Sequence, residues 1–182
     1  MPRMEGLGIR PAISSDIPDL IALDHNYSTD HVWQMEFRSR ADEVASTFRE
    51  VRLPRAMRVV YPREPRRLAD EWTRRSVILV AEHSESRRGY LAITESTAED
   101  AAWSTDLVVG QRDRRQGIAS RLVAAAWDWC RQRGYRRLFL EMQSKNYPAL
   151  QLARKLGFGY AGYSDRYYPN EDIALFFCLD LA

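Results

Sequence analysis

The sequence contains few cysteines, little net charge and no long apolar run, and each shortage excludes a class of protein. Its two cysteines, Cys130 and Cys178, stand far apart, with no CxxC pair and no histidine at metal-binding spacing. They are therefore expected to pack in a core in a reducing compartment. The 27 basic residues face 25 acidic ones, and the net charge of +2 argues against a general nucleic-acid-binding protein. Because the sequence has neither an apolar membrane span nor the apolar stretch of a signal peptide, we expect a cytoplasmic protein without a metal, nucleic-acid or membrane partner.

The chain has the length and composition of one globular domain. Its 182 residues are 45% apolar and 29% charged, enough for a core without disulfides. Short β-branched runs predict strands, and apolar residues at helical spacing predict helices. The predicted strands are 6–12, 76–82, 88–96, 101–109, 135–143 and 171–181, the predicted helices are 15–23, 65–74, 116–133 and 146–157, and 45–61 is predicted as a hairpin. The strand–helix–strand order over 101–143 implies a parallel pair with a right-handed crossover, so the fold class is α/β or α+β with a mixed sheet.

The segment LVVGQRDRRQGIASRLV, residues 107–123, has the features of an anion-binding turn. A helix that follows a strand presents free N–H groups and the positive end of its dipole. Gly117 lets the backbone come close to a phosphate, Ala119 leaves the next turn open, and Arg114 and Arg115 would add charge-assisted hydrogen bonds. The motifs GxxxxGK[ST] and GxGxxG are missing, which argues against a P-loop and a dinucleotide fingerprint. On spacing alone, an alternative stays open: Gly117 could serve only a tight turn among surface arginines.

Two motifs in this half of the chain resemble those of the GNAT acetyltransferase superfamily. RRQGIA, residues 114–119, is similar to the family's acetyl-CoA motif Q/R-x-x-G-x-G/A, and the eight-residue step from Val109 to Gly117 is also the family's step. NYPALQLARKLGF, residues 146–158, is similar to the second family motif, a helix opened by asparagine and ended by Gly-Phe. The resemblance covers roughly residues 76–182. Three looser stretches, LDHNYSTDHVWQME, LEMQSKN and YYPNEDIALFF, are similar to the streptothricin acetyltransferase group.

The resemblance implies a GNAT-type fold, in which a mixed and partly split sheet is flanked by helices. It implies one domain over 1–182, with a coenzyme-binding core at about 76–158 and acceptor-side elements at about 14–75 and 159–182. The implied cosubstrate is acetyl-CoA, with its pyrophosphate at the glycine turn and its pantetheine along the strand that ends at residue 109. The implied coenzyme-binding residues are Leu107, Val108, Val109, Arg114, Arg115, Gln116, Gly117, Ile118, Ala119 and Asn146.

The implied reaction is the attack of a neutral amine on the acetyl thioester. An alkyl ammonium has a pKa of about 10.4 and a thiol one of about 8.5, so removing the amine proton is the larger problem at neutral pH. Asp106 and Glu141 are the first candidates for the general base, and Glu95 is a weaker one. Pairing of these carboxylates with arginines, or a water chain with no single base, stays an open alternative.

The chain departs from the family at the residue that protonates the leaving thiolate. Many relatives carry a tyrosine seven residues after the motif asparagine, and here that position is Ala153. We expect another tyrosine or water to serve, with Tyr147 and Tyr163 as the first candidates. The thiolate could also leave unaided, or the protein could be a non-catalytic acyl-CoA sensor.

Carboxylates and aromatic side chains gather in the segments expected on the acceptor side, a combination that suits a cationic amine. The predicted acceptor-binding residues are Asp24, Tyr27, Asp30, Trp33 and Tyr167. The two aspartates could instead cap helix ends, Trp33 could pack in the core, and His25 and His31 are weaker candidates. We expect an N-acetyltransferase that acts on a primary amine of a cationic small molecule, streptothricin-like or another, with a link to antibiotic resistance. A peptide or protein N-acetyltransferase is the alternative, and a homodimer is left open.

Overall fold

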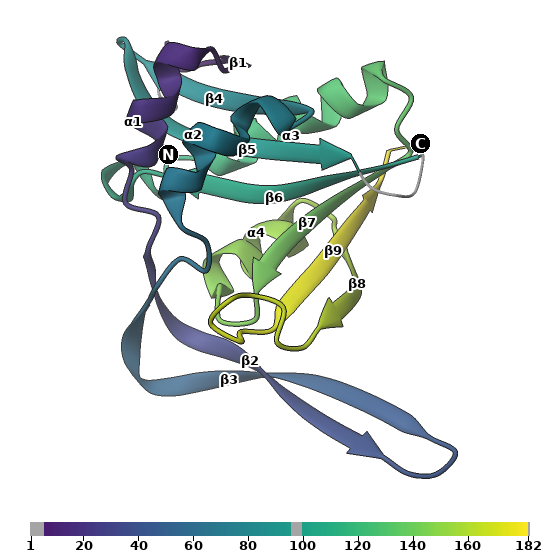
Figure 1. Ribbon diagram of the computed structural model, residues 1–182. Helices are drawn as coiled ribbons and strands as arrows, with labels where there is room; N and C mark the ends of the chain where they lie inside the picture. Colours follow the sequence, from purple (N-terminus) through teal and green to yellow (C-terminus); the bar gives the residue numbers. More distant parts are fainter. Residues whose placement is uncertain (1–5, 96–99, 182) are drawn as a thin grey trace.

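A seven-stranded mixed sheet forms the centre of the computed structural model, which describes residues 6–95 and 100–181 (Figure 1). The strands lie in the order β1-β4-β5-β6-β7-β9-β8. Their bounds are Gly8–Pro11 (β1), Val77–His83 (β4), Ser86–Glu95 (β5), Ala101–Val109 (β6), Arg137–Gln143 (β7), Gly159–Ser164 (β8) and Ala174–Asp180 (β9). β6 and β7 are parallel, and the other neighbouring pairs are antiparallel. The predicted mixed sheet is confirmed, while Ser96, the predicted end of β5, lies outside the described residues.

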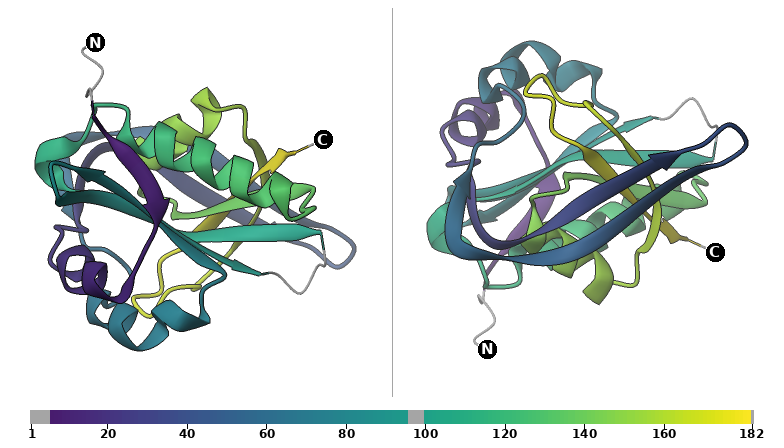
Figure 2. Two further views of the ribbon diagram at one scale, coloured as in Figure 1. Left: turned by 90° about the horizontal axis from the view of Figure 1, so that it is seen from above. Right: turned by 90° about the horizontal axis from the view of Figure 1, so that it is seen from below.

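Helices cover both faces of this sheet (Figure 2). α3 (Ile118–Gln132) connects β6 to β7 on one face, whereas α1 (Ile17–Ile21) and α2 (Leu68–Glu71) lie on the other. α4 (Tyr147–Lys155) follows β7. Single 3-10 turns lie at Ser14–Asp16, Pro65–Arg67, Trp72–Arg74 and Gln111–Asp113. The four predicted helical regions are confirmed, with ends that shift by a few residues.

Alternation along β4 separates two hydrophobic cores. Leu79 packs in the cluster that contains Leu122 of α3, and Val80 packs in the cluster that contains Leu20 of α1. Successive side chains of a strand point to opposite faces, so the continuous apolar run of β4 serves both layers. Val80 and Leu122 are completely buried, which places β4 in the middle of the molecule.

A long two-stranded ribbon extends below the sheet (Figure 1). It consists of β2 (Tyr27–Ser39) and β3 (Val44–Val59) in antiparallel register. The prediction of a hairpin within 45–61 is therefore wrong, because that segment is one strand and its partner is the polar and aromatic stretch before it. The turn lies at residues 40–43, where the backbones of Arg40 and Glu43 exchange hydrogen bonds. Pro54, a residue that favours turns, lies instead opposite the shift of register between Thr29 and His31.

The sheet splits between β6 and β7. The two strands pair from Ala101 to Ser104 of β6, and beyond Ser104 they diverge (Figure 1). Thr105 forms a bulge there, because Ser104 and Asp106 pair with the consecutive residues Ile93 and Ala92 of β5. A bulge bends its strand and re-aims its side chains. The predicted partly split sheet is confirmed, and the split lies at the carboxyl ends of two parallel strands.

Candidate active site

The turn between β6 and α3 is open to an anion. Gly117 precedes the helix with a φ of 84°, and no side chain of the described residues caps this helix start. A Cβ atom built at Gly117 would meet nothing within 4 Å. The first N–H groups of a 15-residue helix therefore face open space, together with the exposed side chains of Arg115 and Gln116. The residues here fit a pyrophosphate.

The Arg114 guanidinium contacts two backbone carbonyls. Its Nε donates to the Val109 carbonyl at 2.9 Å and its Nη2 donates to the Asp24 carbonyl at 2.7 Å. Burial lowers the pKa of this half-buried guanidinium. Arg114 thus ties the turn to the segment after α1, and Arg115 is left as the more exposed cation of the pair.

A narrow cavity lies in the split of the sheet. β6 lines it with Ser104, Thr105 and Leu107, β7 with Leu140 to Gln143, and α4 with Asn146, Ala149 and Leu152. Acceptor-side segments complete it with Tyr61, Pro62, Arg63 and Tyr168. The cavity therefore joins the two halves of the chain that the resemblance assigns to coenzyme and acceptor.

Arg63 spans this cavity from β6 to β7. Its Nη1 donates to the Thr105 carbonyl at 2.9 Å, and its Nη2 pairs with the Glu141 carboxylate. The Arg63 guanidinium also lies 5.1 Å from the centre of the Tyr168 ring and 3.8 Å from the nearest Asp106 oxygen. Burial lowers the pKa of Arg63, but the carboxylates of Asp106 and Glu141 raise it by more. Arg63 thus brings the two predicted bases into one network.

The two carboxylates differ in their access to the cavity. Glu141 lines it, its side chain is 1% exposed, and one of its oxygens accepts from the Tyr167 hydroxyl at 3.0 Å. Asp106 lies behind the lining, where it accepts from the Tyr61 hydroxyl and from the Thr105 hydroxyl at 2.8 Å. Both carboxylates lie beside arginines, which is the alternative to a role as base that the sequence left open.

The other predicted acceptor residues take structural positions. Tyr27 is buried and donates to Gln143 at 2.8 Å, and burial raises its pKa. The Asp24 carboxylate accepts from the backbone N–H of Asn26 at 3.0 Å, and Asp30 contacts His31 on the surface. Trp33 packs beside Phe177, with Arg154 above its ring at 4.7 Å. Of the five predicted residues, Tyr27 and Tyr167 have hydroxyls that reach cavity-lining groups, Gln143 and Glu141.

The two tyrosines expected to protonate the thiolate contact the ribbon. The Tyr147 hydroxyl donates to Glu50 at 2.9 Å while its ring stacks on His31, and the Tyr163 ring packs edge-on against Phe48. Neither side chain belongs to the cavity lining within residues 6–95 and 100–181. The cavity is lined instead by Tyr61 and Tyr168, and Ala153, at the family's tyrosine position, is completely buried in the α3 core. Tyr61 and Tyr168 thus join water as candidates for the proton donor.

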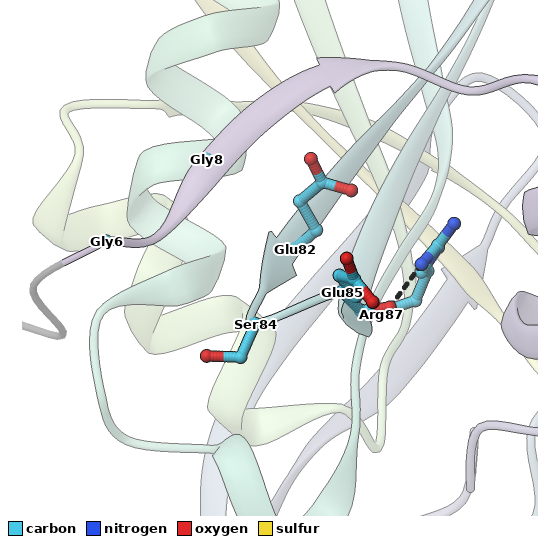
Figure 3. A pocket seen from close by; sticks show the side chains of 6 residues that line it. All are labelled: Gly6, Gly8, Glu82, Ser84, Glu85 and Arg87. Carbon is cyan, nitrogen blue, oxygen red and sulfur yellow. Dashed lines mark hydrogen bonds between the residues drawn. The ribbon is translucent and has the colours of Figure 1, made fainter.

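A wider depression lies at the turn between β4 and β5 (Figure 3). Its polar side chains are already used within the fold, since Glu82 pairs with Arg10 at 2.8 Å and Arg87 pairs with Asp16 at 2.7 Å. Arg87 also donates to the Glu85 carbonyl (Figure 3). The cavity in the split of the sheet is the better candidate site, since Asp106 and the turn before α3 belong to β6 and its C-terminal end, and Glu141 lies on the neighbouring β7.

Within residues 6–95 and 100–181, no group of three or more His, Cys, Asp or Glu side chains is placed to hold a metal ion. Within the same ranges, no helix is both long enough and apolar enough to cross a bilayer.

Comparison with known proteins identifies the family. The model of the Acetyltransferase (GNAT) family matches residues 44–158, more than half of the chain. The chain therefore belongs to the GNAT acetyltransferases. Its class is that of an acetyl-CoA-dependent N-acetyltransferase, as the two motifs implied.

Individual relatives carry related names. Streptothricin acetyltransferase of Streptomyces lavendulae is 30% identical over 82 residues, which span 45% of this chain and 43% of that protein, less than half of its length. The crystal structure of nourseothricin acetyltransferase matches with a TM-score of 0.81 and 24% identity, covering 97% of this chain and 99% of that one. A candidate streptothricin acetyltransferase of Bacillus anthracis, solved with acetyl coenzyme A, matches with a TM-score of 0.73 and 19% identity over 96% and 99% of the two chains. The likeness to the two structures shows the same fold.

Proposed function

We propose that the protein transfers the acetyl group of acetyl-CoA to a primary amine of a cationic small molecule, with streptothricin as the first acceptor to test. The observation that carries the proposal is the cavity in the split sheet, which joins the anion-binding turn to carboxylates and aromatic rings. The names of the streptothricin and nourseothricin relatives support the choice of acceptor. We place the reaction in the cytoplasm, and acetylation of this antibiotic would give resistance to it.

The coenzyme half of the site follows from the open helix start. We propose that the pyrophosphate binds the N–H groups after Gly117 beside Arg115, and that the pantetheine follows β6 toward Leu107. Asn146 lines the cavity from α4 and would meet the end of the pantetheine arm. The remaining coenzyme contacts are proposed for the backbone of Val108, Val109, Gln116, Ile118 and Ala119. Arg114 would support them by holding the turn in place.

The acceptor half follows from the groups at the other end of the cavity. Glu141 and the Tyr168 ring already hold one cation, the Arg63 guanidinium, and the same groups would suit an ammonium group through charge and cation–π attraction if Arg63 moved aside. The free volume is only about 40 Å³, room for a few waters but not for an amine beside a pantetheine arm. Arg63 and Tyr168 therefore have to shift when the reactants enter.

The direct test measures thiol release with acetyl-CoA and streptothricin, lysine, spermidine or a peptide with a free N-terminus. We expect turnover with streptothricin and little with the peptide. A preference for the peptide would mean that the acceptor is a peptide or protein and not a small molecule. Binding of acetyl-CoA without transfer to any amine would favour a non-catalytic sensor.

Gly117→Asp tests the coenzyme site separately. The new carboxylate would face the pyrophosphate, so we expect acetyl-CoA affinity by calorimetry to fall at least tenfold. Gly117→Asn is the matched control. Asparagine has the shape of aspartate without its charge, and it would occupy the same left-handed backbone position. Equal losses in both variants would point to the backbone alone, and unchanged affinity in a folded Gly117→Asp protein would exclude the site.

A further inference from the structure

A buried cluster of titratable side chains lies directly behind the cavity. It consists of His25, Tyr61, Tyr90 and Asp106 and lies on the α1 and α2 side of the sheet. Tyr61 is the member that lines the cavity, and its hydroxyl donates to the Asp106 carboxylate. Tyr61 therefore connects the place of the reaction to a carboxylate that the reactants do not reach.

His25 fixes the direction of the protons in this cluster. Its Nδ1 lies 2.7 Å from the Leu23 carbonyl, which can only accept, so Nδ1 carries the proton. Burial lowers the pKa of His25, which favours a neutral ring with a bare Nε2. The Tyr90 hydroxyl lies 3.1 Å from Nε2 and donates to it. Tyr90 thus directs its proton away from Asp106, and the His25 ring packs against Tyr61 at 5.0 Å.

Asp106 is surrounded on every side by groups that can donate or carry charge. From its own strand the Thr105 hydroxyl donates to it, and from β5 the buried Tyr90 lies close by. The other facing groups are Tyr61 and Arg63 from residues 60–64, Arg75 from the segment before β4 at 3.8 Å, and His25 from the turn after α1. Arg75 in turn pairs with Glu71, and Arg63 with Glu141.

We propose that Tyr61 is the catalytic acid–base residue of acetyl transfer and that Asp106 takes up and returns the proton that Tyr61 relays. The inference rests on the proposed function. Tyr61 cannot act as a free phenolate, because burial and the Asp106 charge raise its pKa well above the ordinary value. A neutral phenol can still pass a proton when it accepts one and donates another in the same step. The bond from Tyr61 to Asp106 supplies the outgoing half of that step.

Proton transfer is timed to the bond changes. A carboxylate is a far weaker base than an amine, so direct transfer of a proton from the bound ammonium to a carboxylate would be uphill. The first surplus proton therefore leaves to water as the amine enters. As the C–N bond forms, Tyr61 Oη takes the second proton from the nitrogen and passes its own to Asp106 Oδ1. As the C–S bond breaks, Asp106 returns that proton to Tyr61, whose own proton goes to the sulfur. The products are the amide, the coenzyme thiol and one proton released to water.

The proposed relay also explains how the protein could work with alanine at position 153, where many relatives have a tyrosine. The family position faces a completely buried core site here, whereas Tyr61 reaches the cavity from the acceptor side. One tyrosine outside the motif can thus serve both as base and as acid.

The test uses the full chain with acetyl-CoA and streptothricin, and with lysine and spermidine as further amines. We expect Tyr61→Phe to lower kcat about 100-fold or more, while the KM for the amine and the calorimetric Kd for acetyl-CoA stay within about twofold. Asp106→Asn should give the same split between kcat and KM. Tyr135→Phe is the matched control, since its hydroxyl meets Glu95 on the surface at 3.0 Å, and it should keep the wild-type kcat.

The outcomes separate the two levels of the proposal. An active wild-type protein whose Tyr61→Phe variant keeps kcat within threefold overturns the relay and leaves the function standing. A loss that appears only in KM or in acetyl-CoA affinity also overturns the relay. If the wild-type protein acetylates none of the amines, the proposed function fails and the relay with it. Should Tyr61→Phe fail to fold, Asp106→Asn decides by the same measurements.

Discussion

Two buried aspartates show, at the scale of single residues, how a structural carboxylate differs from one available for chemistry. Asp16 accepts from Arg10 at 2.7 and 3.0 Å, from Arg87 at 2.7 Å and from the Ile13 backbone at 2.9 Å. Asp106 accepts from two hydroxyls instead, with arginine nitrogens 3.8 Å away. A hydroxyl can give up its proton along the bond and a guanidinium cannot. The partners of Asp106 therefore suit proton transfer, and those of Asp16 suit stability.

Asp16→Asn should destabilise the fold in a pH-dependent way. The hydrogen bonds from Arg10 hold the pKa of Asp16 below its ordinary value of 3.8. A depressed pKa contributes stability that is complete above the unfolded-state value and is lost as pH falls through the folded-state value. We expect Asn to lower the free energy of unfolding by about 3 kcal/mol at pH 7.

Urea denaturation at pH 7, 5 and 4 measures that difference. Asp19→Asn is the control, because the Asp19 side chain is 61% exposed and lies 3.9 Å from Arg87. The gap between the two variants should be largest at pH 7 and begin to shrink at pH 4. A gap that widens toward low pH would contradict the assigned role of Asp16.

At the scale of elements, the capping residue just before α4 serves folding, and we propose that it also serves binding. The Asn146 side chain accepts from the Ala149 N–H at 3.2 Å as the cap of the helix, and it also lines the cavity. Asn146→Ala should cost about 1 kcal/mol of stability through the cap. It should also weaken acetyl-CoA binding, measured by calorimetry.

Asn146→Ser separates the two tasks, because serine caps a helix as well as asparagine but is shorter. We expect this variant to unfold near the wild-type denaturant concentration and still bind acetyl-CoA more weakly. Full recovery of affinity in Asn146→Ser would mean that the residue acts through the helix alone.

The elements that could be predicted from sequence are those with a strong local signal. α3 and α4 follow from apolar spacing, from Asn146 as cap and from glycines with φ near 80° at Gly134 and Gly157. β8 and the β2–β3 ribbon have weaker signals. β8 contains two glycines, and the ribbon alternates polar and apolar residues that mostly stay exposed or half-buried. Its pairing is set by a turn at residues 40–43 that has no strong turn motif.

At the scale of the whole molecule, the candidate site also combines features that have a local sequence signal with features that have none. The glycine turn before α3 is contiguous in sequence, so its open helix start could be predicted, as could the places of Asp106 and Glu141 on the two diverging strands, while anion binding by the turn stays a prediction. Tyr61 and Arg63 were missed, because they reach these carboxylates across 45 and 78 positions of sequence. A contact of that range depends on how the ribbon returns to the sheet. No local pattern in the sequence specifies it.

The ribbon contacts α4 along its middle rather than at its tip. In the middle, where Glu50 pairs with Trp33, the Glu50 carboxylate accepts from Tyr147 of α4 at 2.9 Å and pairs with Arg154 at 3.2 Å. At the tip, Phe37 is 54% and Val44 69% exposed. We therefore expect the middle of the ribbon to position the proposed acceptor-side segments and the tip to contribute little.

Shortening the tip tests this division. Phe37 pairs with Ser46 in the ribbon, so residues 38–45 can be replaced by Asn-Gly, the preferred two-residue turn between antiparallel strands. We expect the shortened protein to keep its thermal midpoint within about 3 °C and its kcat within about twofold, since the excised side chains lie outside the cavity and the core. Glu50→Ala, which removes the contacts with Tyr147 and Arg154 instead, should raise the KM for the amine by loosening the ribbon strand that leads to Tyr61 and Arg63. A shortened ribbon that abolishes acetylation while acetyl-CoA still binds would show that the tip itself contacts the acceptor.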